Sequence, residues 1–200
     1  MTTLLRPGMQ KIVYVFYKNK NKKIHLRELA RITGMQGQSI TRYLNELEKE
    51  SILSAEKQGN LKLYSLKNNN TVRSMLAFFD IERFKKLPNI RKDAIASYIK
   101  KLQEIPVFII IFGSTAKETY AEDSDIDLLI VTNRKISAKE AEKEADAINA
   151  TKISTFQITY KDFMIELKLK EDAVIQSAIS TGYPIINHVY YYEVLQNERI

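Results

Sequence analysis

The sequence predicts a two-domain chain of the α/β (α+β) class, in which a small basic domain precedes a larger domain built on a sheet. Three observations predict it. Residues 1–70 hold 13 Lys/Arg and 5 Asp/Glu, a net charge of +8, whereas residues 71–200 hold 18 and 19. Apolar residues at helical spacing alternate with short apolar runs typical of strands. A polar break at residues 67–70 separates the two parts.

Composition narrows the classes of function. The chain has no cysteine, which excludes disulfides, cysteine-based zinc sites and thiol nucleophiles. His25 and His188 are too far apart in sequence to suggest a ligand pair. No signal pattern and no apolar run of about 18 residues occurs, so we expect a cytoplasmic protein without a membrane partner. The basic first third favours a nucleic-acid-binding part, and a lysine-rich solubilising surface is the alternative.

The basic domain is predicted to combine helices with a hairpin. The expected order is helix, helix, turn, helix and hairpin, at residues 9–17, 26–32, 33–35, 37–50 and 52–66. Gly34 in the turn is free to take a positive φ. Ile40, Leu44 and Leu47 form the buried stripe of the third helix. The hairpin carries a basic tip at residues 57–60.

This order resembles the winged helix-turn-helix domains of small bacterial and archaeal transcription regulators, over residues 8–67. The resemblance implies that the helix from Gly37 enters a major groove of double-stranded DNA, with the hairpin near the backbone or minor groove. Side chains of the types that reach base edges and phosphates lie at Gln36, Gln38, Ser39, Thr41, Arg42 and Asn45 of the helix and at Lys57, Asn60 and Lys62 of the hairpin. The alternative is a domain that only contacts other proteins.

Two helices are expected to connect the domains. They span residues 71–86 and 91–102, and Pro88 and Pro106 end them. Their apolar lines predict packing between the domains, and formation of a homodimer is the alternative. The predicted organisation is therefore a DNA-binding domain at 1–70, connector helices at 71–104 and a second domain at 105–200.

The second domain is predicted to alternate strands and helices. Strands are expected at 107–112, 125–131, 152–158 and 183–186, and helices at 114–121, 137–149, 160–169 and 171–181. Residues 137–140 and 159–162 have the form of capping boxes, which mark helix starts. This order indicates a small α/β domain.

The chemically informative residues lie where two apolar runs meet loops. Residues 108–112 lead into Gly113 and Ser114, and Asp125 and Asp127 open the next run. Because residues two apart on a strand share a face, both carboxylates point the same way. Backbone N–H groups at a helix start and a serine hydroxyl can hold phosphate oxygens, and carboxylates suit Mg²⁺. The stretch therefore suits a metal-bound triphosphate.

Gly113-Ser114, ten further residues and Asp125-x-Asp127 resemble the signature of minimal nucleotidyltransferases of the DNA polymerase β superfamily, over about residues 105–186. Glu118 departs from the glycine often found at its position. The resemblance implies a small mixed sheet flanked by helices, an NTP substrate (ATP) and Mg²⁺ or Mn²⁺. It implies catalytic and metal-binding roles for Asp125 and Asp127, and nucleotide contacts from Gly113, Ser114, Lys117 and Ser124.

A third carboxylate is expected in active members of this superfamily, on a later strand, and the sequence does not supply it there. Residues 152–158 contain neither Asp nor Glu. Thr155 or Gln157 is expected to point inward, and neither replaces a carboxylate as metal ligand or base. Asp162 is expected to cap a helix. The motif therefore favours binding of a metal-nucleotide over its turnover.

Two functions remain open. The first is transfer of NMP from ATP to a hydroxyl, on a protein, coupled to DNA binding; the resemblance implies a HEPN-type toxin as a partner, since small nucleotidyltransferases often adenylylate such toxins. The second is a transcription regulator whose degenerate domain only senses nucleotide. A weaker alternative has the basic domain guide tRNA or another RNA to the site. Residues 190–192, three tyrosines, are interpreted as packing of an edge segment rather than as nucleotide acceptors.

Overall fold

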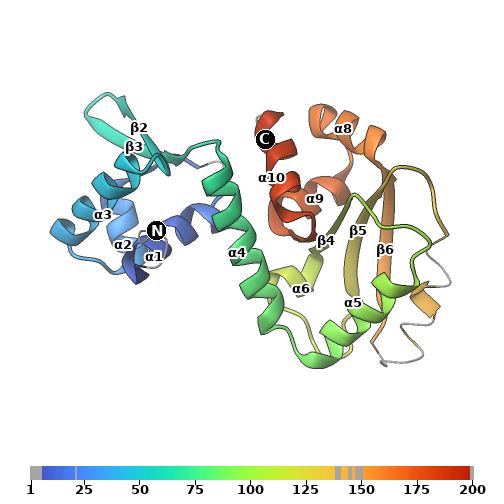
Figure 1. Ribbon diagram of the computed structural model, residues 1–200. Helices are drawn as coiled ribbons and strands as arrows, with labels where there is room; N and C mark the ends of the chain where they lie inside the picture. Colours follow the sequence, from blue (N-terminus) through green and yellow to red (C-terminus); the bar gives the residue numbers. More distant parts are fainter. Residues whose placement is uncertain (1–5, 21, 138–140, 144–145, 147–150, 199–200) are drawn as a thin grey trace. The chain divides into compact units, whose positions relative to one another are not determined.

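A computed structural model describes residues 6–20, 22–137, 141–143, 146 and 151–198 (Figure 1). The chain forms two compact units, Met1–Phe79 and Asp80–Ile200. The division falls inside one helix, α4 (Asn70–Lys86), rather than at residue 70 as the sequence suggests. The apolar side chains of α4 explain the difference. Phe79 packs against the ring of Tyr17 in the first unit, whereas Phe84 packs against the core of the second.

The first unit contains the helices and the hairpin that the sequence predicts. Its elements are α1 (Pro7–Lys18), β1 (Ile24–His25), α2 (Leu26–Thr33), α3 (Gly37–Lys49), β2 (Leu53–Gln58) and β3 (Leu61–Leu66). The strands form an antiparallel sheet in the order β1-β3-β2. β1 is an addition to the prediction, because two residues are too short to show a strand period.

Local chemistry explains where these elements begin and end. The Nδ1 atom of His25 accepts a hydrogen bond from the backbone N–H of Arg27 at 3.1 Å and so caps α2. Gly34 ends α2 at φ 68°, which confirms the predicted turn. Ile40, Leu44 and Leu47 of α3 are buried, as their spacing predicts.

The second unit is a mixed α/β structure built on four strands. Its further elements are α5 (Asn89–Lys101), β4 (Phe108–Phe112), α6 (Gly113–Lys117), β5 (Ile126–Thr132), β6 (Ile153–Thr159), α8 (Tyr160–Leu169), α9 (Ala173–Thr181), β7 (Tyr183–Ile186) and α10 (His188–Asn197). The strand order is β6-β5-β4-β7. β5 and β6 are parallel, and the other pairs are antiparallel. The small mixed sheet is therefore confirmed.

Of the two predicted capping boxes, the structure describes the one at residues 159–162. The hydroxyl of Thr159 accepts a hydrogen bond from the backbone N–H of Asp162 at 3.2 Å, which confirms the cap of α8. The capping box at 137–140 lies largely outside the described residues, as does much of the helix predicted at 137–149. The described residues 141–143 and 146 of that stretch are helical.

The two faces of the sheet carry different helices. Ile109, Ile111 and Leu128 share a buried cluster with Tyr98 of α5, which lies against the sheet in Figure 1. On the other face, the ring of Phe108 contacts rings of α8 and α10. The helix predicted at 91–102 thus belongs to the core of the second unit. Its stripe is apolar because it covers the sheet, so the connector at 71–104 is not a separate part of the fold.

The C-terminal tyrosines lie in helix α10, not in an extended edge segment. Tyr191 and Tyr192 are buried, and the hydroxyl of Tyr192 donates to Asp80 at 2.9 Å. Tyr190 is 43% exposed and its ring contacts Phe108, at the end of β4 away from Gly113. The three adjacent tyrosines hide the helical period, since only two of them face the core. No helix in the described part of the chain combines the length and apolar character needed to cross a membrane.

Candidate nucleotide site

The site is built where β4 ends and β5 begins. Phe112 pairs with Asp127 across the antiparallel ladder, which places Asp127 beside Gly113. Gly113 has φ 64°, and a Cβ atom at this residue would lie only 1.9 Å from Oδ2 of Asp127. Two features therefore favour glycine at residue 113. Its backbone has a positive φ, and the carboxylate of Asp127 fills the space that a side chain would need.

The two aspartates lie close enough to influence each other. Asp127 is on β5, and Asp125 comes just before that strand; both are half-buried. Burial raises the pKa of the Asp127 carboxyl, and the negative charge of Asp125 raises it further. Two carboxylates that repel each other are a donor set that fits a divalent cation, because the cation offsets the repulsion.

The residue just before β6 is a lysine that contacts one of the aspartates. Nζ of Lys152 lies 2.8 Å from Oδ2 of Asp125, and the hydrogen bond raises the pKa of Lys152. The carbonyl of Lys152 accepts from the N–H of Ile126 at 2.8 Å, which fixes its backbone beside Asp125. The sequence does not reveal this contact, because it depends on the register between β5 and β6.

That register corrects the residues expected to point inward from β6. Asp127 pairs with Ser154 in the parallel ladder, so Ser154 lies beside the carboxylate. Thr155 points to the opposite face, where its hydroxyl donates to the hydroxyl of Tyr98 at 3.2 Å. Gln157 shares that face and lies 3.2 Å from the hydroxyl of Thr132. The expectation for Thr155 and Gln157 was wrong because strand alternation alone cannot fix register.

Within the described ranges of the chain, no third acidic ligand joins the pair. In the described part of the chain, no three His, Asp or Glu side chains gather as a metal site. Asp162 lies in the first turn of α8, whose N-cap is Thr159, and its carboxylate accepts from the hydroxyl of Thr159 at 2.6 Å. Glu122 and Asp123 are exposed in the loop before Asp125.

A buried arginine holds the loop between the two halves of the motif. Arg91 of α5 is 2% exposed and donates to the hydroxyl of Thr115 at 3.0 Å. It also donates to the carbonyls of Ala121 at 3.1 Å and Ser124 at 2.8 Å. Its guanidinium lies 4.0 Å from the ring centre of Tyr120. Sequence reasoning missed Arg91, although it continues the buried stripe of α5 at i, i+4 and i+7 with Ile95 and Tyr98.

The other predicted nucleotide contacts surround α6. Ser114 is half-buried in its first turn, and Lys117 is exposed at its end. The hydroxyl of Ser124 accepts from the backbone N–H of Ala121 at 2.9 Å and so shapes the loop. Glu118 has φ 60°. This left-handed conformation favours glycine, which accounts for the glycine often found at this point of the motif.

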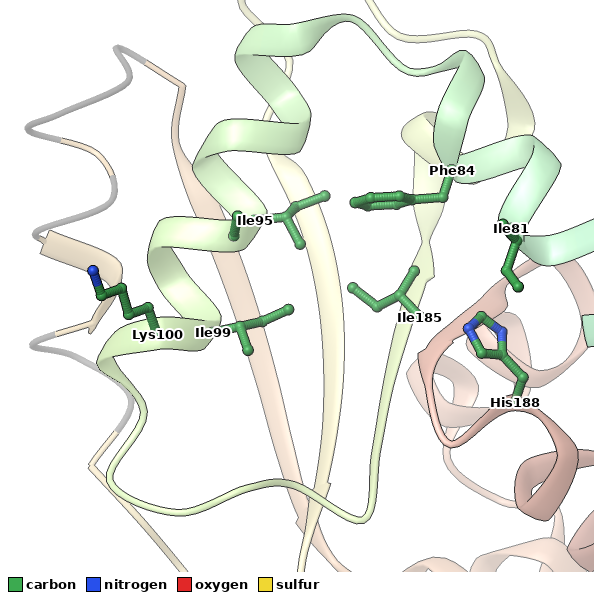
Figure 2. Close-up of a pocket in the computed structure, with 8 residues that line it drawn as sticks. Ile81, Phe84, Ile95, Ile99, Lys100, Ile185 and His188 are labelled. Atoms are coloured by element: carbon green, nitrogen blue, oxygen red, sulfur yellow. The ribbon is translucent and has the colours of Figure 1, made fainter.

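A separate cavity lies on the α5 face of the second unit (Figure 2). Its volume is about 490 Å³. Its lining consists of Ile81, Phe84, Ile95, Ala96, Ile99, Lys100, Ile185 and His188. Figure 2 shows Ile95 and Ile99 pointing toward Phe84 and Ile185. The lining is mostly apolar and contains none of the motif residues, so this cavity does not suit a triphosphate.

The predicted DNA-binding residues lie on two neighbouring elements of the first unit. Nζ of Lys62 on β3 lies 2.8 Å from Oε2 of Glu48 on α3, so the hairpin and the helix are adjacent. The predicted residues that are exposed are Gln36, Gln38, Thr41, Arg42 and Asn45 of the helix and Lys57, Asn60 and Lys62 of the hairpin, while Ser39 is half-buried. The charge of Lys62 is partly offset by Glu48. The guanidinium carbon of Arg42 lies 5.0 Å from the ring centre of Tyr43.

One family model matches part of the second unit. Residues 92–184 match the family model of the nucleotidyltransferase domain. The match runs from α5 into β7 and includes the whole motif from Gly113 to Asp127. It supports nucleotidyl transfer as the chemistry of this domain. Nucleotidyltransferases generally use an NTP and a divalent metal.

Solved structures resemble the chain only distantly. AF1382 from Archaeoglobus fulgidus is 11% identical, covers 42% of this chain and 96% of its own, and has a TM-score of 0.36. TrmBL2, described as an archaeal chromatin protein with a novel mode of DNA binding, is 17% identical over 88% of this chain and 69% of its own, with a TM-score of 0.29. Scores this low carry no argument about fold. No curated protein matches the chain.

Proposed function

We propose that the second unit binds an NTP together with Mg²⁺ or Mn²⁺ and transfers its NMP group to a hydroxyl. The observation that carries the proposal is the approach of Asp127 to Gly113, which joins the two halves of the matched motif at one point. Asp125 and Asp127 would hold the cation. Gly113, Ser114, Lys117 and Ser124 are the proposed contacts of the nucleotide.

The reaction follows from general phosphoryl chemistry. The acceptor oxygen bonds to the α-phosphorus, the bond from that phosphorus to the bridging oxygen breaks, and pyrophosphate leaves. The acceptor hydroxyl gives up its proton to a solvent water molecule. A bound divalent cation supplies positive charge against the charge that develops on the phosphate oxygens. The chain's own contribution is to orient the triphosphate at the end of β4 and to hold the cation beside it.

We propose ATP as the nucleotide and a protein hydroxyl as the acceptor, with a HEPN-type protein as the partner. The positions of the three C-terminal tyrosines argue against these residues as the acceptor. Tyr190 contacts Phe108, which is four residues from Phe112, or roughly 13 Å along the strand. Tyr191 and Tyr192 are buried.

Labelled ATP tests the transfer. The protein is incubated with ATP labelled on the α-phosphate, Mg²⁺ and candidate partner proteins. Label should move to a partner with the native chain and fail to move with Asp125→Ala/Asp127→Ala. Equal labelling by both would show that the transfer does not come from this site.

We further propose that the first unit is a winged helix-turn-helix domain that binds double-stranded DNA and that the chain acts in the cytoplasm. The net charge of +8 over residues 1–70 and the adjacency of α3 to the hairpin support this. A homodimer, which would present two copies of α3 to one DNA site, is testable from the mass of the protein in solution. A gel-shift series with DNA and tRNA separates DNA binding from guidance of an RNA.

A specific observation favours a second candidate, a regulator that senses nucleotide without turning it over. Ser154 on β6 and Lys152 just before it lie where active relatives supply a carboxylate, and neither is acidic. This candidate predicts that nucleotide changes the affinity for DNA while no pyrophosphate forms. Release of pyrophosphate that depends on Asp127 would exclude it.

A further inference from the structure

A positively charged side chain, Lys152, lies beside Asp125 of the motif. A site for two cations would have a negatively charged ligand there. The ladder between β5 and β6 starts at Ile126 and Ile153, so Asp125 and Lys152 are the residues just before each strand. The hydrogen bond from the N–H of Ile126 to the carbonyl of Lys152, at 2.8 Å, fixes the two backbones together. Lys152 therefore enters the site from a defined place in the sheet.

Among the residues that the structure describes, the acidic ligands near the motif are too few for two divalent cations. Two cations that clamp one phosphate group need shared carboxylates on both sides. Among the described residues, the motif offers Asp125 and Asp127 without a third acidic ligand, and Asp125 already contacts an ammonium at 2.8 Å. A second divalent cation at Asp125 would lie close to the positive charge of Lys152 and would be repelled by it.

We propose that Lys152 takes the place of the second metal ion, so that the nucleotide binds with one divalent cation and one lysine ammonium. This inference rests on the proposed function. An ammonium has three donors, so Lys152 can keep its hydrogen bond to Asp125 and donate to a phosphate oxygen as well. Its side chain is 67% exposed, which leaves room for a ligand to approach it.

The rival explanation is an ordinary surface ion pair. Exposed pairs of this kind contribute little to stability and have no ligand. Lys168 provides a matched control, because its Nζ lies 3.6 Å from Oε2 of Glu198 and its side chain is 68% exposed. A surface pair predicts equal behaviour for Lys152 and Lys168, whereas a ligand-binding lysine predicts a difference.

The test counts metal ions and measures affinity without any turnover. Mn²⁺ is titrated into the full chain with a non-hydrolysable ATP analogue, and free Mn²⁺ is read by electron paramagnetic resonance. We expect one Mn²⁺ per chain. Lys152→Ala should weaken binding of the analogue roughly 10-fold or more, since a charge-assisted hydrogen bond is lost. Lys168→Ala should leave the affinity unchanged.

A gain-of-ligand variant sharpens the result. Lys152→Glu replaces the ammonium by a carboxylate and should raise the count to two Mn²⁺ per chain. Two Mn²⁺ in the native chain, or an affinity that Lys152→Ala leaves unchanged, would overturn the role of Lys152 while nucleotide binding still stands. No binding of the analogue to the native chain would instead overturn the proposed function itself.

Discussion

The carboxylate of Asp127 fills the space where a side chain at residue 113 would lie, since a Cβ atom on Gly113 would be 1.9 Å from Oδ2. The glycine and the aspartate are thus one structural unit, although fourteen positions separate them in the chain. Positive φ at Gly113 adds a second reason against any other residue. This relationship connects the fold of the motif directly to its ability to hold a cation.

Replacement of Gly113 should damage the site and the fold together. Gly113→Ala should displace the Asp127 carboxylate, weaken binding of Mg-ATP and destabilise the second unit by more than the strain of the backbone alone. Gly34→Ala is the matched control, because Gly34 also has positive φ and no described atom lies within 4 Å of its Cβ position. Gly34→Ala should lower the free energy of unfolding by about 1–2 kcal/mol. Urea unfolding measures both variants, and equal losses would contradict the account.

The burial of Asp127 and its repulsion by Asp125 give a prediction about pH. The pKa of Asp127 is raised in the folded state, so the folded protein binds the proton more tightly than the unfolded chain. Without metal, stability should therefore be lost as pH rises through the folded pKa. Asp127→Asn removes this loss and should raise the metal-free Tm at neutral pH by about 1–3 °C.

The advantage of Asp127→Asn should shrink as pH falls below the raised pKa, because the native carboxyl then becomes neutral too. Added Mg²⁺ should raise the Tm of the native chain and not that of the variant. Thermal scans at several pH values, with and without Mg²⁺, measure both effects. A variant that is less stable than the native chain at neutral pH without metal would argue against repulsion at this site.

Arg91 should be a large contributor to the stability of the second unit. Arg91→Ala removes the hydrogen bonds to the carbonyls of Ala121 and Ser124 and should cost about 2–4 kcal/mol of unfolding free energy. Arg91→Lys should keep only part of the stability of the native chain, because an ammonium lacks the planar, forked geometry with which a guanidinium reaches several acceptors. Lys92→Ala, one residue on, should stay within about 0.5 kcal/mol of the native chain. Similar costs for residues 91 and 92 would show that the loop does not depend on Arg91.

Arg42 tests the proposed DNA surface. Arg42→Ala should weaken binding to a DNA duplex roughly 5- to 100-fold, as expected for loss of one arginine contact. It should also lower the dependence of affinity on salt by about one unit of slope. Lys11→Ala, an exposed cation on α1, is the control and should have a smaller effect. Fluorescence anisotropy at several salt concentrations measures both, and equal effects would favour non-specific attraction over a recognition helix.

The part of the site that lies within one stretch of chain was predictable. Gly113, Ser114 and the two aspartates stand at the ends of apolar runs. Local spacing placed Gly113 and Ser114 correctly after β4 and Asp127 on β5, whereas Asp125 lies just before that strand. The strands β4 and β5 were predictable for the same reason, since continuous apolar runs mark strands buried on both faces.

The part that depends on distant residues was not predictable. The position of Lys152 beside Asp125 and of Ser154 beside Asp127 follows from a parallel register, which no local pattern fixes. Arg91 reaches across from another helix to the loop of the motif. A charged residue on an otherwise apolar stripe is the signal that would have found it.

The central claim is that the motif from Gly113 to Asp127 binds a metal-nucleotide. Equilibrium binding of labelled ATP to the full chain, with Mg²⁺ and with a chelator, tests it most directly. The account predicts binding that requires Mg²⁺ in the native chain and is lost in Asp125→Asn/Asp127→Asn, while the variant keeps its fold. Absence of binding to the native chain, or binding that survives in the double variant, would contradict it.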